Sequence, residues 1–251
     1  MSGTVIIDCF PSCVSRYQHG YAVVAVDVIR ATTTAVTAVS AGRRCFPVSS
    51  LDQAYHLKER FADGLLIGEV AGDMPEGFDM NNSPAQLLLR NDQHCPVIML
   101  SSSGTQLMHA SQTCDTAYIA CLRNYRFLAN HLAGLFPKVA IIGAGSRGEF
   151  REEDQMCCAW IAEELLKAGY IAENNGTMEL VESWSGSPVE ACLTGNSAAY
   201  LKNSNQLDDL DFILTHVNDV PSAFTLEDGE VVPSHVSPMI GAGSSLDPVA
   251  A

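Results

Sequence analysis

Carboxylate, guanidinium and hydroxyl side chains stand close together in the stretch YAVVAVDVIRATTTAVTAVSAG, residues 21–42. Asp27 and Arg30 follow an apolar run and precede Thr32 and Thr33 at the start of a helical pattern. A carboxylate at a strand end can bind Mg²⁺, and a guanidinium can bind a phosphate through two hydrogen bonds. Free N–H groups at a helix N-terminus also favour anions. The stretch suits a phosphate and a metal ion, but Asp27 could equally cap the helix while Arg30 lies on the surface.

Further polar clusters follow apolar runs in the same way. They are Glu69 with the loop AGDMPEGFDMNN, the SSSGT segment at residues 101–105, Asn124 beside Arg123, and the acidic segment that ends at Asp154. In open parallel sheets, ligands bind beyond the carboxyl ends of the strands. We therefore expect these clusters to gather at one site, although each alone could be an ordinary turn or helix cap.

The segment GAGSRG, residues 143–148, matches the G-x-G-x-x-G pattern of dinucleotide-binding proteins. Two observations count against that function. Glu149, Glu152, Glu153 and Asp154 place carboxylates where a pyrophosphate would lie. The acid expected about 20 residues further on, at a strand end, has no clear counterpart. The acids fit metal coordination or the positive end of a helix dipole better.

Other hydrolase signatures are missing from the sequence. It contains no C-x₅-R segment and no G-x-S-x-G elbow. Ile29 stands two positions after Asp27, so the paired aspartates of aspartyl-phosphate phosphatases are absent too. The seven histidines form no H-x-x-x-H pair, which argues against a zinc site.

Composition places the chain among ordinary globular proteins. Its formal net charge of -15 argues against a nucleic-acid surface, because phosphate backbones are bound by clustered Lys and Arg. Nine scattered cysteines, mostly in apolar runs, predict buried, reduced thiols. The start MSGTVIIDCF has no secretory pattern, and no apolar run approaches the ~18 residues of a membrane span. We therefore expect a cytoplasmic protein with no membrane partner.

Apolar runs alternate with helical patterns along most of the chain. Predicted strands cover residues 4–9, 21–27, 44–48, 65–70, 96–100, 117–121 and 139–142, and predicted helices cover 31–41, 51–61, 84–90, 106–110, 125–135 and 155–168. Because the strands are continuously apolar, both faces of the sheet must be covered. The pattern predicts a three-layer α/β/α fold with a mostly parallel sheet, as one domain or two similar lobes.

The later part of the chain is harder to interpret. SPVEACLTG at 187–195 and SAAYLKN at 197–203 resemble helices, and DFILT at 211–215 resembles a strand. A Gly, Ser and Pro-rich segment follows Ser234. We expect one catalytic domain over residues 1–233 and a tail over residues 234–251.

Several motifs, in this order and spacing, resemble the 2-phosphosulfolactate phosphatase (ComB) family. They are VDVIRATTT, GEVAGDMPEGFDMNNSP, SSSGT, the strand-end Asn124 and AGSRGEFREED. The resemblance covers residues 5–169 well and DFILTHVNDVPSAF more faintly. The sequence departs from the family pattern at Ser103, where Asn is usual, and at Asn81, where Gly usually precedes N-S-P.

The resemblance implies a Mg²⁺-dependent phosphatase that converts 2-phosphosulfolactate to sulfolactate and phosphate, a step known from coenzyme M biosynthesis. Asp27 and Arg30 are the expected catalytic residues, with Asp27 either orienting a water or acting as the nucleophile. The candidate metal ligands are Asp27, Glu69, Asp79, Glu153 and Asp154. The candidate substrate ligands are Thr32, Thr33, Asn82, Ser83, Ser102, Ser103, Gly104, Thr105, Asn124 and Arg147, with Arg123 as a further donor.

Two other functions stay open at this point. The family fold could hold an acidic metabolite without turnover, or, less in keeping with the acidic residues, the chain could be a dinucleotide-binding oxidoreductase. The two departures lie in the expected substrate loops, so they bear on the identity of the acid more than on the reaction. A homodimer is the oligomeric state that the resemblance suggests.

Overall fold

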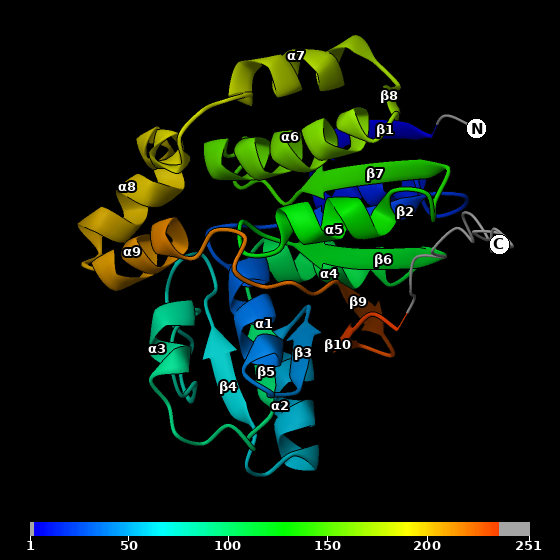
Figure 1. Ribbon diagram of the computed structural model, residues 1–251. Helices are drawn as coiled ribbons and strands as arrows, with labels where there is room; N and C mark the ends of the chain where they lie inside the picture. Colours follow the sequence, from blue (N-terminus) through cyan, green and yellow to red (C-terminus); the bar gives the residue numbers. More distant parts are fainter. Residues whose placement is uncertain (1–2, 236–251) are drawn as a thin grey trace, which may run out of the picture.

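The structure is a computed structural model and describes residues 3–235 of the chain. Its strands form one sheet in the order β4-β5-β3-β10-β9-β6-β2-β7-β1-β8, with helices packed on both faces (Figure 1). The strands are β1 (Thr4–Cys9), β2 (Ala22–Val26), β3 (Cys45–Val48), β4 (Leu65–Gly68), β5 (Val97–Leu100), β6 (Thr116–Ala120), β7 (Lys138–Gly143), β8 (Ile171–Ala172), β9 (Phe224–Glu227) and β10 (Glu230–Pro233). The predicted three-layer α/β fold with a mostly parallel sheet is confirmed.

The helices occupy the connections between strands, as the alternating pattern predicts. They are α1 (Ala31–Ser40), α2 (Leu51–Arg60), α3 (Pro84–Leu88), α4 (Gly104–Ser111), α5 (Tyr125–Leu132), α6 (Glu152–Lys167), α7 (Asn175–Trp184), α8 (Asn196–Asn203) and α9 (Leu207–Thr215), with short 3₁₀ helices η1 (Pro11–Arg16) and η2 (Val189–Thr194). Capping follows local chemistry. Ser50 and Ser83 each accept a hydrogen bond from a backbone N–H group in the first turn of α2 and α3.

Two parts of the predicted fold need correction. The segment DFILT is the C-terminal half of α9 and not a strand, because Asp209, Leu210, Phe212 and Ile213 are buried with helical spacing. Strands β8, β9 and β10 and helix α7 were not predicted. The remaining predicted strands and helices are present with ends shifted by a few residues.

The sheet consists of two parallel blocks joined by a hairpin. Strands β4, β5 and β3 form one block, and β6, β2, β7, β1 and β8 form the other. The hairpin β9–β10 lies between them and pairs antiparallel with both β6 and β3. The pairs β6–β9, β9–β10 and β10–β3 are all antiparallel, so the strands of one block run in the opposite direction to the strands of the other. The sheet also twists strongly, so that β4 runs up the page in Figure 1 while β7 runs across it.

The central strand β2 shows why the apolar runs are continuous. Its residues are all fully buried, and they alternate between two clusters. Val23 and Ala25 pack in the cluster that includes α1 and α4, whereas Val24 and Val26 pack in the cluster that includes α5 and α6. Both faces of the strand are therefore core, as in parallel sheets generally.

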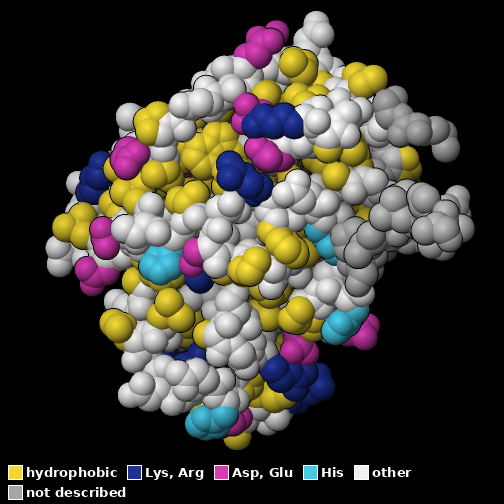
Figure 2. All heavy atoms as spheres, viewed as in Figure 1, with side chains coloured by type: hydrophobic (Ala, Val, Ile, Leu, Met, Phe, Trp, Pro, Cys, Tyr) yellow, Lys and Arg dark blue, Asp and Glu magenta, His cyan; other side chains and the backbone are white. Residues whose placement is uncertain are grey.

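Other expectations concern the surface and the thiols. All nine cysteines are free, and eight of them are buried, as the apolar runs around them predict. Among the residues described, no helix is long and apolar enough to span a membrane. On the face shown in Figure 2, Lys and Arg side chains are scattered and several lie beside acidic residues. The predicted tail falls mainly on residues 236–251, outside the described part of the chain.

Candidate active site

A cavity of about 790 Å³ lies where the two blocks meet. Segments that follow β2, β4, β5 and β7 line it, although the blocks run in opposite senses, because the twist of the sheet brings these four carboxyl ends together. Helix α8 contributes the remaining wall. The polar lining residues are Asp27, Arg30, Glu69, Asn82, Ser101, Ser102, Ser103, Ser146, Arg147, Glu149, Arg151, Glu153, Asp154, Asn196, Ser197, Tyr200 and Asn203.

Asp27 stands between the end of β2 and the start of α1. Its Oδ1 accepts a hydrogen bond of 3.1 Å from the Ala31 N–H, and the carboxyl is almost wholly buried. Thr32 and Thr33 donate their hydroxyls to the carbonyls of Asp27 and Val28, at 2.7 Å each. These threonines fix the turn after β2 and do not line the cavity. Their β-branched hydroxyls satisfy backbone acceptors, which is a different use from the predicted contact with phosphate.

The SSSGT segment approaches Asp27 from the end of β5. A Cβ atom on Gly104 would lie 2.1 Å from Asp27 Oδ2, so only glycine allows this approach. Ser102 and Ser103 line the cavity. Thr105 is fully buried, and its hydroxyl exchanges hydrogen bonds with the backbone of Ser101. Thr105 therefore closes the βα turn and does not face a ligand.

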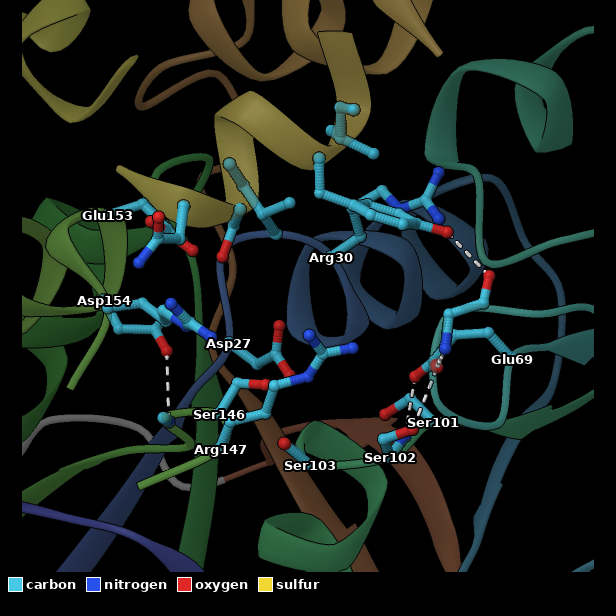
Figure 3. Close-up of a pocket in the computed structure, with 18 of the residues that line it drawn as sticks. Asp27, Arg30, Glu69, Ser101, Ser102, Ser103, Ser146, Arg147, Glu153 and Asp154 are labelled. Atoms are coloured by element: carbon cyan, nitrogen blue, oxygen red, sulfur yellow. Dashed lines mark hydrogen bonds between the residues drawn. The ribbon is translucent and has the colours of Figure 1, made fainter. Parts of the chain in front are cut away.

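Three buried carboxyl groups lie near one another at one side of the cavity (Figure 3). Burial raises the pKa of Asp27 to about 6, with a smaller contribution from Glu69. Burial, then the charges of Asp27 and Glu152, raises the pKa of Glu153 to about 7. The pKa of Asp154 is raised for the same reasons, by burial and by the charges of Asp27 and Glu153. Such mutual repulsion is what a bound cation would relieve.

The hydrogen bonds divide these acids into two kinds. Asp154 accepts from the N–H groups of Val28 and Gly145, so it ties the β2 and β7 loops together. Glu69, across the cavity, likewise accepts from the Gly72 N–H and from Ser102. By contrast, Glu153 Oε2 is buried and has no hydrogen-bond partner within residues 3–235. An orphaned carboxylate oxygen on a residue that lines the same cavity as Asp27 is chemically suited to a divalent cation.

The described residues form no ready-made three-carboxylate cage at the cavity. Among the described residues, the one group of three Asp, Glu, His or Cys side chains with ligand atoms all within 4.8 Å is Asp63, His94 and Cys95. That group lies at the amino ends of β4 and β5, away from the cavity. The acids at the cavity are more widely spaced, so a cation there would need water or substrate oxygens to complete its coordination.

The cavity also contains three arginines. Arg30 is already ion-paired with Asp209. Arg151 donates to Glu149, and its buried Nε has no hydrogen-bond partner in the described part of the chain. Arg147 makes no ion pair with any described residue and has a positive φ of 52° in the tight turn after β7. In Figure 3, Arg147 and Arg30 lie in the same part of the cavity as Asp27. An anion could therefore be bound close to the carboxylates.

Several predicted site residues lie away from the cavity. The Asp79 carboxylate accepts from the Leu66 N–H at 2.8 Å, beside the edge strand β4. Ser83 donates to Asp209, and Asn124 hydrogen bonds with the backbone of Cys121 and Ile119. Arg123 pairs with Asp219. These side chains are used inside the fold, which neither their type nor their position in the chain revealed.

Comparison with known proteins agrees with this arrangement. A family model described as 2-phosphosulpholactate phosphatase matches residues 11–224. The chain belongs to this family. A probable 2-phosphosulfolactate phosphatase of Deinococcus radiodurans is 32% identical over 74% of this chain and 80% of its own length. Similar proteins with the same description occur in Carboxydothermus hydrogenoformans, with 31% identity over 69% of this chain and 72% of its own, and in Clostridium perfringens, with 27% over 86% and 90%.

Membership of the 2-phosphosulpholactate phosphatase family confirms the resemblance and the expected enzyme class, a phosphoric monoester hydrolase. The two departures from the family pattern both lie at the site. Ser103 lines the cavity, and Asn81 Oδ1 accepts a 3.2 Å hydrogen bond from Arg30. The two positions where this chain differs from the expected pattern therefore either line the cavity or contact a residue that does.

Sequence reasoning missed the contribution of α8 and of Arg151. Asn196 donates to Glu149 at 3.0 Å, and the Tyr200 hydroxyl donates to the Gly72 carbonyl at 2.6 Å. Helix α8 is thus attached to the β7 loop on one side of the cavity and to the β4 loop on the other. Nothing in the segment SAAYLKN indicates this, because the contacts join residues that are far apart in the chain.

Proposed function

We propose that the protein hydrolyses 2-phosphosulfolactate, or a closely related small phosphorylated hydroxy acid, with Mg²⁺ bound beside Asp27. The observation that carries the proposal is a set of buried carboxyl groups with raised pKa values beside arginines in one cavity. A phosphate ester needs positive charge around its oxygens, which a divalent cation and guanidinium groups supply. The family supports this choice of substrate.

Asp27 and Glu153 are the residues that would hold Mg²⁺. Asp27 Oδ2 is turned toward Gly104 and not toward the α1 backbone, and Glu153 Oε2 has no hydrogen-bond partner among the residues described. Mg²⁺ commonly uses only one or two carboxylates and fills its octahedron with water and substrate phosphate. The wide spacing of the acids is compatible with Mg²⁺ coordination by only one or two of them. When bound, Mg²⁺ supplies charge that offsets the carboxylates and the phosphate oxygens.

The remaining groups bind and orient the substrate. Arg147 and Arg30, which line the cavity together with Asp27, would donate to the phosphate oxygens. The unpartnered Nε of Arg151 suits a carboxylate or sulfonate at the other end of the substrate. Asp27 orients the attacking water. The water oxygen bonds to phosphorus and loses a proton, the ester P–O bond breaks, and the leaving oxygen takes up a proton to become the hydroxyl of the released acid.

The carboxylates at the start of α6 also weigh against a dinucleotide. Glu153 and Asp154 occupy the first turn of α6, where the pyrophosphate of a dinucleotide would have to approach. Both are buried and neither has a lysine or arginine as ion-pair partner among the described residues. A phosphorylated acid with Mg²⁺ suits this turn better than a cofactor that relies on the helix N-terminus alone.

Phosphate release from 2-phosphosulfolactate and other small phosphorylated hydroxy acids tests the proposal. With Mg²⁺ we expect turnover, and with excess chelator we expect none. Asp27→Asn should lower kcat/KM by about 100-fold or more, because it removes charge at the reacting centre. The experiment measures inorganic phosphate, and a melting curve confirms that the variant is folded.

Asp79→Asn is the matched control, since Asp79 is an acid of the same sequence motif that lies outside the cavity. It should leave kcat/KM within about 2-fold. The proposal is wrong if no phosphorylated acid is hydrolysed with Mg²⁺ or if Asp27→Asn keeps its activity. A phosphorylated Asp27 trapped during turnover would show that this carboxylate attacks phosphorus itself.

A further inference from the structure

A buried carboxylate from α9 contacts both Arg30 and the start of α3. Asp209 is 2% exposed, and its Oδ2 accepts a hydrogen bond from Arg30 Nη1. Its Oδ1 accepts from Ser83 Oγ at 2.6 Å and from the Ala85 N–H at 3.2 Å. Donors from two distant segments thus converge on one side chain.

Arg30 is held by further acceptors on the same side. Its Nη1 also donates to Gln206 Oε1, and its Nη2 donates to Asn81 Oδ1 at 3.2 Å. A guanidinium carries five N–H groups. Three are used by these acceptors, and the other two donate to no described residue. Since Arg30 lines the cavity while Asp209 does not, the ion pair lies behind the guanidinium as seen from the cavity.

We propose that Asp209 is a positioning residue, which holds the Arg30 guanidinium so that its remaining N–H groups face the substrate phosphate. Ser83 and the Ala85 N–H in turn hold Asp209. The inference rests on the proposed function, because it takes the anion to be the phosphate of that substrate. It also gives Ser83 of the N-S-P segment a role: this hydroxyl acts through Asp209 and does not contact the substrate.

The physical chemistry of the pair favours orientation over net stability. Burying two charges costs most of what their attraction returns, so a buried ion pair is a weak source of stability. It does fix the plane of the guanidinium, and a planar fork binds phosphate well only when it is aligned. An arginine on a flexible loop would lose rotamer freedom on each binding event.

A double-mutant cycle with Asp209→Asn and Arg30→Lys tests the inference. Asparagine keeps the shape of the side chain and an oxygen for Ser83, but it places an amide N–H₂ group or a neutral oxygen against Arg30. Lysine keeps the positive charge beside Asp209 without the fork. The readout is the affinity for inorganic phosphate in the presence of Mg²⁺, measured by calorimetry, together with kcat and KM for the hydrolysed acid.

We expect D209N to weaken phosphate binding and raise KM by about 10-fold. In the R30K background the same change should alter both by less than about 2-fold, because the group that Asp209 positions is gone. An equal loss in both backgrounds would overturn the inference. So would a wild-type protein that binds no phosphate, or a D209N variant whose only change is its melting temperature.

Asp219→Asn is the matched control. It breaks another Asp–Arg pair, in which Arg123 donates from Nε and Nη2 at 3.0 and 2.6 Å, and neither residue lines the cavity. D219N should lower the melting temperature without changing phosphate affinity. If the wild type binds phosphate but hydrolyses no phosphorylated acid, the proposed function fails while the cycle still tests Asp209. If the wild type hydrolyses the acid but the cycle shows no coupling, the proposed function stands and the inference about Asp209 fails.

Discussion

Asp27, Glu153 and Asp154 are carboxyl groups in a buried space, and the cost of charging them there has a sign that experiment can check. A carboxyl group whose pKa rises on folding binds its proton more tightly in the folded state. Its contribution to the free energy of unfolding therefore falls as pH increases from about 4, the usual pKa, to the raised values near 6 and 7. Above that range the full cost of the buried charges remains until a cation offsets it.

In chelator, the wild-type melting temperature should therefore fall between pH 5 and pH 8. Asp27→Asn should melt higher than the wild type at pH 8, by an amount equivalent to about 1–3 kcal/mol, and nearly equally at pH 5. Mg²⁺ should stabilise the wild type more at pH 8 than at pH 5, because its ligands must be deprotonated. Melting curves with and without Mg²⁺ measure all three effects.

Glu182→Gln, which removes an exposed acid from α7, is a suitable control for the change of net charge. It should leave the pH dependence and the response to Mg²⁺ unchanged. If Asp27→Asn melts no higher than the wild type at pH 8 in chelator, a charged Asp27 does not destabilise the folded protein.

At the scale of elements, the site depends on how closely the start of α4 approaches the start of α1. A Cβ on Gly104 would lie 2.1 Å from Asp27 Oδ2 and 2.4 Å from Ala31 Cβ. Neither atom can move away easily, because the Asp27 carboxylate is hydrogen bonded to the α1 backbone and Ala31 is the first residue of α1. The two helix N-termini must separate to admit a methyl group.

Gly104→Ala should consequently lower kcat/KM by about 10–100-fold, since small displacements of reacting groups are costly. It should also lower the melting temperature. Gly176→Ala is the control: it too lies in the first turn of a helix, and its Cβ would meet only Asn174 Oδ1, at 3.6 Å. Gly176→Ala should retain both the activity and the melting temperature of the wild type. Equal behaviour of the two variants would show that the close approach is unimportant.

At the scale of the whole molecule, the hairpin β9–β10 joins two blocks into one core. Val231 of β10 is 1% exposed and belongs to the same cluster as residues of β2 and β5. The blocks should therefore unfold together. Val231→Ala should reduce the free energy of unfolding by about 1–3 kcal/mol, whereas Val232→Ala, on the other face and half-buried, should reduce it less.

Denaturant unfolding followed by two signals checks this expectation. Trp160 in α6 and Trp184 in α7 both pack against the block formed by β6, β2, β7, β1 and β8. Fluorescence therefore reports the unfolding of that block, whereas far-UV circular dichroism reports the whole chain. Coincident transitions indicate one cooperative domain. A dichroism transition that precedes the fluorescence change would instead show two lobes that unfold separately.

These scales differ in how much the sequence predicts. Seven strands were predictable because apolar runs must be buried on both faces of a sheet. The hairpin also carried a local signal, since Asp228 and Gly229 both have positive φ and form the Asp-Gly turn typical of hairpins. No local pattern indicated that this hairpin lies in the middle of the sheet. Pairs such as Arg30 with Asp209, 179 positions apart, depend on topology and not on local pattern.

The position of that hairpin also bears on how the protein is made. Residues 224–233 supply the two strands at the centre of the sheet order, between β3 and β6, yet they come after every other described strand in the chain. On a ribosome, which adds residues from the N-terminus onward, the two blocks can emerge and collapse but cannot share one sheet. Until the hairpin pairs, β3 and β6 present open edges, and the cavity between the blocks lacks the framework that sets its shape. Nascent chains halted before Phe224 should therefore bind holdase chaperones and lack phosphatase activity, although they already contain every residue that lines the site.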